Sequence, residues 1–155
     1  MEIIWQWKSF AELDTRSLYQ VLQLRQDVFV LEQQCLYPDI DNLDSAAYHL
    51  LGFNPVDFSQ ERELVAYLRV VEPARKYAEP SIGRVVTSID WRRKGIGKQL
   101  VQKGLAETKL QFPNENIRIS AQRHLSDFYH KFGFQTVSQP YLEDGIPHVE
   151  MLLCV

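Results

Sequence analysis

The sequence has few cysteines, no long apolar run and little net charge, and each shortage excludes a class of protein. Its two cysteines, Cys35 and Cys154, are too few for a disulfide framework, and with four scattered histidines they show no metal-ligand spacing. No apolar run approaches the length of a membrane span. A formal charge of -3 argues against a general nucleic-acid binder, which would present a basic face. We therefore expect no metal, no membrane and no nucleic-acid partner.

What the chain does contain is enough apolar material for one core. With 155 residues, of which 45% are apolar and 24% charged, it is expected to form a single globular domain over residues 1–155. The N-terminal segment has an acid at position 2 and no extended apolar stretch, which is not the pattern of a signal peptide. We expect a cytoplasmic protein with free thiols.

Apolar periodicity predicts an alternation of strands and helices. Helices are expected over residues 14–30, with Asp14 as N-cap, and over 97–112 and 125–132. Strands are expected over residues 2–8, 48–53, 63–71, 81–89, 117–121, 134–139 and 148–155. Residues 32–48 read as a long acidic loop, 54–62 as a turn region and 72–80 as a loop. This order predicts an α+β fold, a mixed sheet with helices on its faces.

One short segment concentrates positive charge between a predicted strand and a predicted helix. Four cations lie within seven residues, around Gly95 and Gly97: Arg92, Arg93, Lys94 and Lys98. The first N–H groups of a helix lack partners and the helix dipole is positive there, while glycines allow an anion to approach the backbone. Such a turn is suited to bind phosphate. The alternative is a solvated turn that happens to be basic.

Two common phosphate motifs do not fit this turn. A P-loop needs a glycine five residues before Gly97 and Ser or Thr after Lys98, where the chain has Arg92 and Gln99. A dinucleotide fingerprint needs a third glycine where Leu100 stands. The pattern that does fit is Gln/Arg-x-x-Gly-x-Gly/Ala, over residues 92–97.

This hexapeptide resembles the acyl-CoA pyrophosphate loop of the GNAT superfamily of N-acetyltransferases. A second segment, SDFYHKFGF over residues 126–134, resembles that family's Leu/Phe-Tyr-x-Lys-x-Gly-Phe segment. The segments LRQDVFVLEQQCLYPDIDNLD, AQRHLSDFY and EDGIPHVEM are similar to the ElaA-like branch. The resemblance covers most of the chain and implies a layered α/β/α fold. Its mixed, mostly antiparallel sheet would have about six or seven strands, with helices on both faces.

The resemblance also implies which residues bind acetyl-CoA. The strand before the turn would hold the pantetheine arm through its backbone, the turn amides would hold the pyrophosphate, and Gln122 stands where many relatives have a shorter Asn. The residues expected to bind the cofactor are Val85, Val86, Thr87, Arg92, Arg93, Lys94, Gly95, Ile96, Gly97, Lys98, Gln122 and Tyr129. The reaction it implies uses no metal.

By the same resemblance, Tyr129 is the general acid that protonates the leaving thiolate. A phenol is a suitable neutral donor because its unperturbed pKa is about 10. The alternative is a core aromatic residue on an amphipathic helix. Some relatives use a Glu twelve residues before the tyrosine as general base, but this chain has Ile117 there. The candidate bases are Glu32 and His148. The alternatives are that Glu32 is a solvated charge at the helix end and that His148 is a structural histidine. A chain of water molecules could then accept the proton without any single base.

The acidic loop gives the one hint about the acceptor. Asp39, Asp41 and Asp44, with Glu32 beside them and Glu143 and Asp144 later in the chain, could attract a cationic amine, although a solvated turn is the favoured interpretation. Arg25, among apolar helix positions, is a candidate partner for one of them. We expect direct acetyl transfer to a small-molecule or peptide amine, and a homodimer as oligomeric state. The rival hypothesis is a non-catalytic acyl-CoA-binding or sensing module. The sequence shows no histidine–acid pair that would activate Cys35 as a covalent relay.

Overall fold

A computed structural model describes residues 2–55 and 62–155, so most of the turn region expected at 54–62 lies outside the described residues. The strands are β1 (Ile4–Ser9), β2 (Ala47–Phe53), β3 (Leu64–Val71), β4 (Ser81–Thr87), β5 (Ile117–Gln122), β6 (Gln135–Thr136), β7 (Tyr141–Glu143) and β8 (Ile146–Leu153). The helices are α1 (Thr15–Arg25), α2 (Ile96–Gln111) and α3 (Ser126–His130). Short 3-10 turns cover Phe10–Glu12, Asp44–Ala46, Ile89–Trp91 and Arg123–Leu125.

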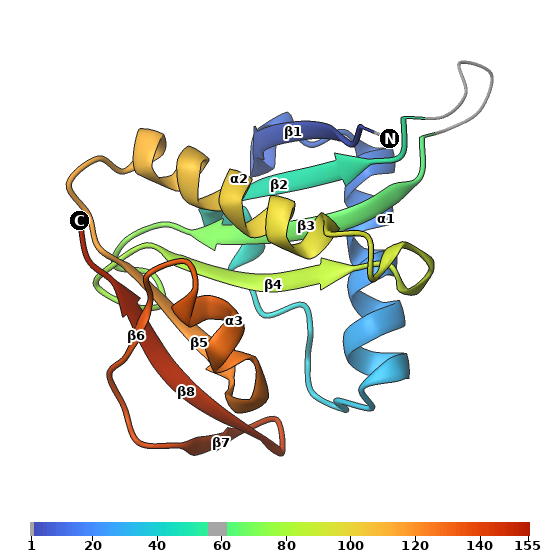
Figure 1. The fold of residues 1–155 in the computed structure, drawn as a ribbon. Helices are drawn as coiled ribbons and strands as arrows, with labels where there is room; N and C mark the ends of the chain where they lie inside the picture. Colours follow the sequence, from blue (N-terminus) through green and yellow to red (C-terminus); the bar gives the residue numbers. More distant parts are fainter. Residues whose placement is uncertain (1, 56–61) are drawn as a thin grey trace.

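The strands form one mixed sheet in the order β1-β2-β3-β4-β5-β8-β6, with β7 paired to β8 (Figure 1). All neighbours are antiparallel except β4 and β5, which confirms the predicted mixed, mostly antiparallel sheet. The prediction missed β7, because a three-residue strand is too short to show alternation. It forms a hairpin with β8 through Asp144 and Gly145, both at positive φ. The strand expected at 134–139 shrinks to the two residues of β6.

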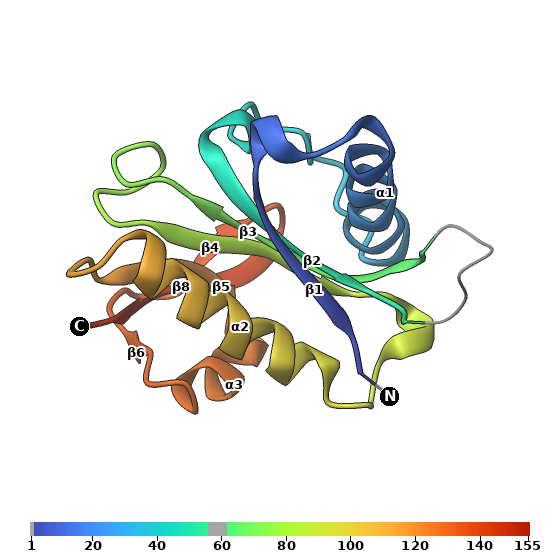
Figure 2. The same ribbon diagram turned by 90° about the horizontal axis from the view of Figure 1, so that it is seen from above.

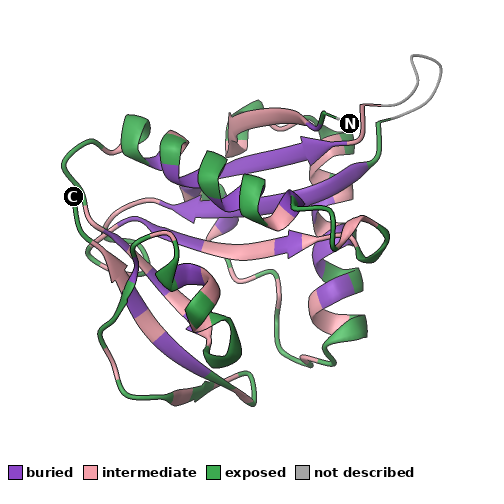
Figure 3. Ribbon diagram, in the orientation of Figure 1, coloured by how far each residue is buried: buried purple, intermediate pink, exposed green. Residues whose placement is uncertain are grey.

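Helices cover both faces of the sheet, as predicted: α1 packs on one face, and α2 and α3 on the other (Figure 2). The core between α1 and the sheet contains Val21, Leu24 and Val28, whereas the core on the opposite face contains Leu100 and Val101 of α2. Strand β3 lies between the two cores and is buried along its whole length (Figure 3). That burial makes β3 the rigid centre from which the neighbouring strands are positioned.

The first helix begins as predicted and continues further than expected. The Asp14 carboxylate accepts a hydrogen bond from the Ser17 N–H at 2.7 Å, which confirms it as the N-cap. After α1 the chain continues as a π-helical turn over Gln26–Glu32. Such wider turns are rare in proteins overall, and those that do occur are often found at functional sites. This one brings Glu32 and the following Gln33 towards the glycine turn and β5.

The sheet opens between β4 and β5, its one parallel pair. Ser81 and Arg118 form the one register pair between these strands in the described part of the chain, and beyond it the strands separate (Figure 1). Strand β4 also shifts register against β3 between Tyr67 and Arg69, where Arg84 has a φ of 51°. Such a bulge redirects the backbone of a strand. An opening next to a bulge leaves β4 backbone groups accessible to a ligand.

No helix within residues 2–55 and 62–155 has the length and hydropathy needed to cross a membrane.

Candidate functional site

Two pockets meet in the opening between β4 and β5. The turn-side pocket lies against the glycine turn and α3, and the loop-side pocket lies against residues 29–39 and the β7–β8 hairpin. Both pockets are lined by Gln33, Val85, Gln122, Leu125 and Tyr129. Counted with the open solvent at their mouths, the turn-side pocket holds about 990 Å³ and the loop-side pocket about 930 Å³. The two pockets therefore adjoin along these shared residues, Tyr129 among them.

The turn-side pocket gathers the residues that the sequence assigned to the cofactor. Of the twelve, all but Lys94 and Lys98 line it: Val85, Val86, Thr87, Arg92, Arg93, Gly95, Ile96, Gly97, Gln122 and Tyr129. The Lys94 ammonium instead lies over the Trp91 ring, 4.7 Å from its centroid. This places strand backbone, glycine turn and α3 around one cavity.

The backbone of the glycine turn suits an anion. Arg93 and Gly95 adopt positive φ values of 63° and 76°, and α2 begins at the next residue, Ile96. No described side chain caps the N–H groups at this helix start. A Cβ added to Gly97 would meet just Thr87 Oγ1, at 3.9 Å, so the turn is open on that side. N–H groups without a side-chain cap, at the positive end of a 16-residue helix, are suited to bind a phosphate.

Arg92 already holds a carboxylate in this structure. Its two terminal nitrogens bind the two oxygens of Glu32, one at 2.7 Å, and its Nε donates to the Thr87 carbonyl oxygen at 3.2 Å. The hydrogen bonds from Arg92 lower the pKa of Glu32, and the Glu32 carboxylate in turn raises the pKa of Arg92. Glu32 is therefore an exposed ion-pair partner of Arg92, and a lowered pKa makes it a poorer base.

Tyr129 lies where the pockets meet and is 7% exposed. Its ring packs edge-on against Phe128 and Phe134, so it is also part of the aromatic core. Burial raises the pKa of its phenol to about 12, because the phenolate would lose its hydration. The hydroxyl is therefore protonated at neutral pH, the state that a proton donor needs.

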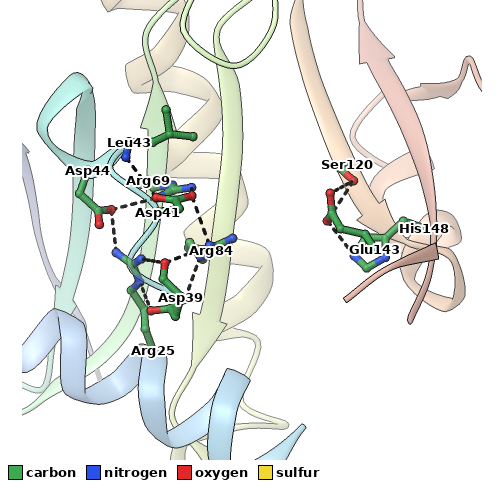
Figure 4. Close-up of polar contacts among 10 residues, drawn as sticks. All are labelled: Arg25, Asp39, Asp41, Leu43, Asp44, Arg69, Arg84, Ser120, Glu143 and His148. Atoms are coloured by element: carbon green, nitrogen blue, oxygen red, sulfur yellow. Dashed lines mark hydrogen bonds and ion pairs between the residues drawn. The ribbon is translucent and has the colours of Figure 1, made fainter. Parts of the chain in front are cut away.

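The acidic loop is a buried ion-pair network, so its interpretation as a solvated turn is wrong (Figure 4). The pairing predicted for Arg25 is confirmed: its guanidinium binds Asp39 at 2.9 Å and Asp44 at 2.7 Å. Arg69 binds Asp44 at 3.0 Å and holds Asp41 through two nitrogens. Arg84, on the β4 bulge, pairs with Asp39 at 2.9 Å and with Asp41 at 3.3 Å.

The arginines keep two of these carboxylates, Asp41 and Asp44, charged. Burial alone would raise the pKa of Asp44, but the hydrogen bonds and charges of Arg25 and Arg69 outweigh it, and its pKa lies below the ordinary value. The pKa of Asp41 is lowered well below its usual range, again against the effect of burial, mainly by Arg69. Three carboxylates thus balance three guanidiniums, and the loop is tied to α1, β3 and β4. With its charges neutralised, it is not the amine-attracting patch that the sequence suggested.

The second candidate base, His148, lies in the loop-side pocket within a polar cluster (Figure 4). Its Nδ1 lies 2.7 Å from the Ile146 carbonyl oxygen and its Nε2 lies 3.3 Å from Glu143 Oε2. Ser120 Oγ lies 3.4 Å from each Glu143 oxygen and 2.5 Å from the Tyr141 hydroxyl. His148 is nearly buried, so its ring orientation is fixed.

Sequence reasoning missed several residues of this site. It did not identify Arg69, Arg84, Gln33 or Ser120, and it considered Glu143 just as one of the acids that could attract an amine. Arg69 carried a readable signal, since a cation inside the apolar run LVAYLRVV must be paired if that strand is buried. The other three gave none, because their roles depend on contacts between distant segments.

Comparison with known proteins connects these pockets to a family. Residues 56–154 match the family described as acetyltransferase (GNAT) domain. A UPF0039 protein of Synechocystis is 42% identical over 155 residues, covering 100% of this chain and 97% of that protein. The crystal structure of Escherichia coli ElaA, 39% identical, superimposes with a TM-score of 0.89 over 98% of this chain and 99% of ElaA.

A solved structure described as an acyl-CoA N-acyltransferase from Pseudomonas aeruginosa is also similar. It is 37% identical, with a TM-score of 0.91 over 99% of this chain and 100% of that one. The family match covers more than half of this chain, and the relatives match nearly all of it. The chain belongs to the GNAT acetyltransferase family, in the branch that contains ElaA and the UPF0039 proteins.

Proposed function

We propose that this protein transfers the acetyl group of acetyl-CoA directly to a primary amine. The observation that supports this most is the junction of the two pockets at Tyr129. The turn-side pocket offers strand backbone for a pantetheine arm and a helix start for a pyrophosphate. The loop-side pocket offers space for the acceptor. The description of the Pseudomonas aeruginosa relative as an acyl-CoA N-acyltransferase agrees with this assignment.

Acetyl-CoA would supply an activated thioester at the junction, and this chain would supply orientation and protons. The amine nitrogen forms a bond to the thioester carbonyl carbon, and the carbon–sulfur bond then breaks. Tyr129 gives its proton to the departing sulfur and regains one from solvent. Holding the two reactants in adjoining pockets replaces a bimolecular encounter with a local one.

A covalent relay through Cys35 has less support than direct transfer. Cys35 lines the loop-side pocket, but burial and the nearby Asp144 charge raise its thiol pKa. A raised pKa reduces the thiolate, which is the reactive form. The competing proposal is a non-catalytic acyl-CoA sensor. It draws on Ile117, buried in the core where some relatives have a catalytic Glu, whereas the neutral Tyr129 at the junction favours an enzyme.

Cofactor binding is tested by calorimetric titration with acetyl-CoA of the wild type, Gly97→Asp and Gly97→Asn. Space around Gly97 accommodates either side chain, since a Cβ at this position would have just Thr87 Oγ1 within 4 Å. The carboxylate repels a pyrophosphate and should abolish binding, while the neutral amide of the same size should retain most of it. A wild type that does not bind acetyl-CoA, or equal binding by both variants, would contradict the turn as a pyrophosphate site.

Turnover separates an enzyme from a sensor. Tyr129→Phe removes the proton donor but keeps the ring that packs on Phe128 and Phe134. We expect kcat for CoA release to fall by about 10²-fold or more, with acetyl-CoA affinity unchanged. The measurement is steady-state CoA release with a panel of primary amines. Unchanged kcat where chemistry limits the rate would exclude Tyr129 as the acid. The acceptor's identity and the homodimer stay predictions.

A further inference from the structure

The loop-side pocket ends in a carboxylate–imidazole pair, Glu143 and His148, that the proposed mechanism above does not use. We infer that this pair binds the acceptor's ammonium group and that His148 Nε2 removes its proton. The inference rests on the proposed function and names its substrate class: an aliphatic primary amine, which is a cation at neutral pH. Glu143 binds, and His148 binds and acts as the base.

The hydrogen bonds fix which ring nitrogen can accept a proton. A carbonyl oxygen accepts hydrogen bonds and cannot donate them. The 2.7 Å contact with the Ile146 carbonyl oxygen therefore requires the hydrogen to be on His148 Nδ1. In the neutral ring the lone pair is then on Nε2. That nitrogen faces Glu143 Oε2 at 3.3 Å, and a carboxylate oxygen is also an acceptor. Two acceptors this close are stable together when a proton or a cation with N–H groups lies between them.

A primary ammonium meets this requirement. It has three N–H donors, so it can donate one to Nε2 and one to Oε2, and it neutralises the carboxylate. A neutral amine could satisfy the geometry but not the charge. The inferred specificity is therefore for a cationic amine.

The surroundings hold both side chains in place. His148 is 7% exposed, and the Tyr141 ring stacks beside it at 6.2 Å with an interplanar angle of 27°. Ser120 lies 3.4 Å from both Glu143 oxygens and 2.5 Å from the Tyr141 hydroxyl. The other charged or titratable groups that line this pocket from neighbouring elements are Cys35, Tyr37, Asp39, Lys76, Arg84, Tyr129 and Asp144.

The pair lies one strand away from the junction of the pockets. His148 on β8 is the register partner of Gln122 on β5, and Gln122 lines both pockets. Directly opposite residues on antiparallel strands have Cβ atoms about 5 Å apart. An amine held by His148 and Glu143 therefore lies close to the place where Tyr129 meets the thioester. The other candidate base, Glu32, is bound to Arg92 and lines neither pocket.

The proton balance of the reaction is complete with these groups. The ammonium transfers one proton to Nε2, and the resulting imidazolium pairs with Glu143. The free amine forms the nitrogen–carbon bond, the carbon–sulfur bond breaks, and the nitrogen loses a second proton to solvent. Sulfur takes the Tyr129 proton, which Tyr129 regains from solvent, and His148 later releases its proton to solvent. The products are the amide, CoA and one net proton.

Two isomeric amines test the assignment. Benzylamine is a cation near pH 7, whereas 4-methylaniline has the same atoms but is a neutral amine that needs no base. His148→Asn keeps an N–H that can donate to the Ile146 carbonyl oxygen and removes the basic nitrogen. We expect kcat/KM for benzylamine to fall by about 10²-fold in His148→Asn, and its KM to rise about 10-fold in Glu143→Gln. Rates with 4-methylaniline should change by less than about 3-fold in both.

The matched control is His130→Asn, since His130 is exposed and contacts Thr136 outside both pockets. It should leave both amines unaffected. An equal loss for both amines in His148→Asn would show a structural role, and no loss would exclude the base. Either result overturns the inference while the proposed function stands. A wild type that binds acetyl-CoA but acetylates no primary amine of the panel, these two included, would overturn the proposed function itself, and the inference with it.

Discussion

Two arginine–carboxylate systems flank the proposed site and differ chiefly in burial. On the side of the loop-side pocket, Arg25 and Arg69 have side chains 0% and 2% exposed within a network of three arginines and three aspartates. On the side of the turn-side pocket, Arg92 and Glu32 form one pair with side chains 36% and 35% exposed. The chemistry of the contacts is the same, and the environment decides what each contributes.

A buried charge that loses its partner cannot be solvated, whereas an exposed one can. Breaking a buried pair by removing one member costs about 3–5 kcal/mol, while exposed pairs contribute about 0–1 kcal/mol. The network therefore fixes the wall formed by residues 39–44 against α1, β3 and the β4 bulge. The Arg92–Glu32 pair can open at little cost, and Arg92 is then available to a phosphate. The wall of the loop-side pocket is therefore rigid, and the Arg92 side of the turn-side pocket is adaptable.

Asp44→Ala should have the largest effect, because Asp44 binds two buried guanidiniums at 2.7 and 3.0 Å. Its removal leaves Arg25 and Arg69 with one carboxylate partner each. We expect the free energy of unfolding to fall by about 3 kcal/mol or more, measured by urea denaturation. Asp27→Ala, at an exposed position of the π-helical turn, is the control and should stay within about 0.5 kcal/mol. A similar small change for Asp44→Ala would show that the network is not a stabilising contact.

Acid should distinguish the two systems next. The folded-state pKa values of Asp41 and Asp44 lie below the ordinary value of 3.8. The contribution of these carboxylates to the free energy of unfolding is complete at pH values above their pKa in the unfolded state. It is lost as the pH falls through their pKa in the folded state. Denaturation at a series of pH values from about 6 to about 3 should show falling stability in the wild type. The fall should be shallower in Asp44→Asn, which cannot titrate there, and just slightly shallower in Glu32→Gln, because the exposed Arg92–Glu32 pair contributes less. Parallel curves for wild type and Asp44→Asn would contradict the pKa assignment.

The sequence predicted local features better than distant pairings. The Asp14 cap, the glycine turn before α2 and most strands depend on neighbouring residues, so pattern alone identified them. The partner of Glu32 lies 60 residues away on the glycine turn, and nothing local to either segment announces the contact. The Arg25 pairing was predictable because a cation on an apolar helix face needs a partner. That Arg69 and Arg84 share the same aspartates depends on strand register.

Glu32→Gln should have the smallest effect and should test the adaptable side directly. In the free protein Glu32 occupies the guanidinium of Arg92, which lines the turn-side pocket. A pyrophosphate must compete with that carboxylate for Arg92. Removing the carboxylate's charge should strengthen acetyl-CoA binding by about 3- to 5-fold, the equivalent of an exposed ion pair of up to about 1 kcal/mol. Calorimetric titration measures the change.

The gain should depend on the pyrophosphate and not on the thioester. Acetyl-pantetheine lacks phosphate groups, so its affinity should be the same in Glu32→Gln and in the wild type. Asp27→Asn removes a carboxylate from an exposed position of the same π-helical turn and controls for general charge. An equal gain for both ligands would show that Glu32 restricts the pocket in some other way. A weaker affinity for acetyl-CoA would mean that Glu32 positions Arg92 for the phosphates instead of competing with them, and the exposed pair would then be as fixed in function as the buried network.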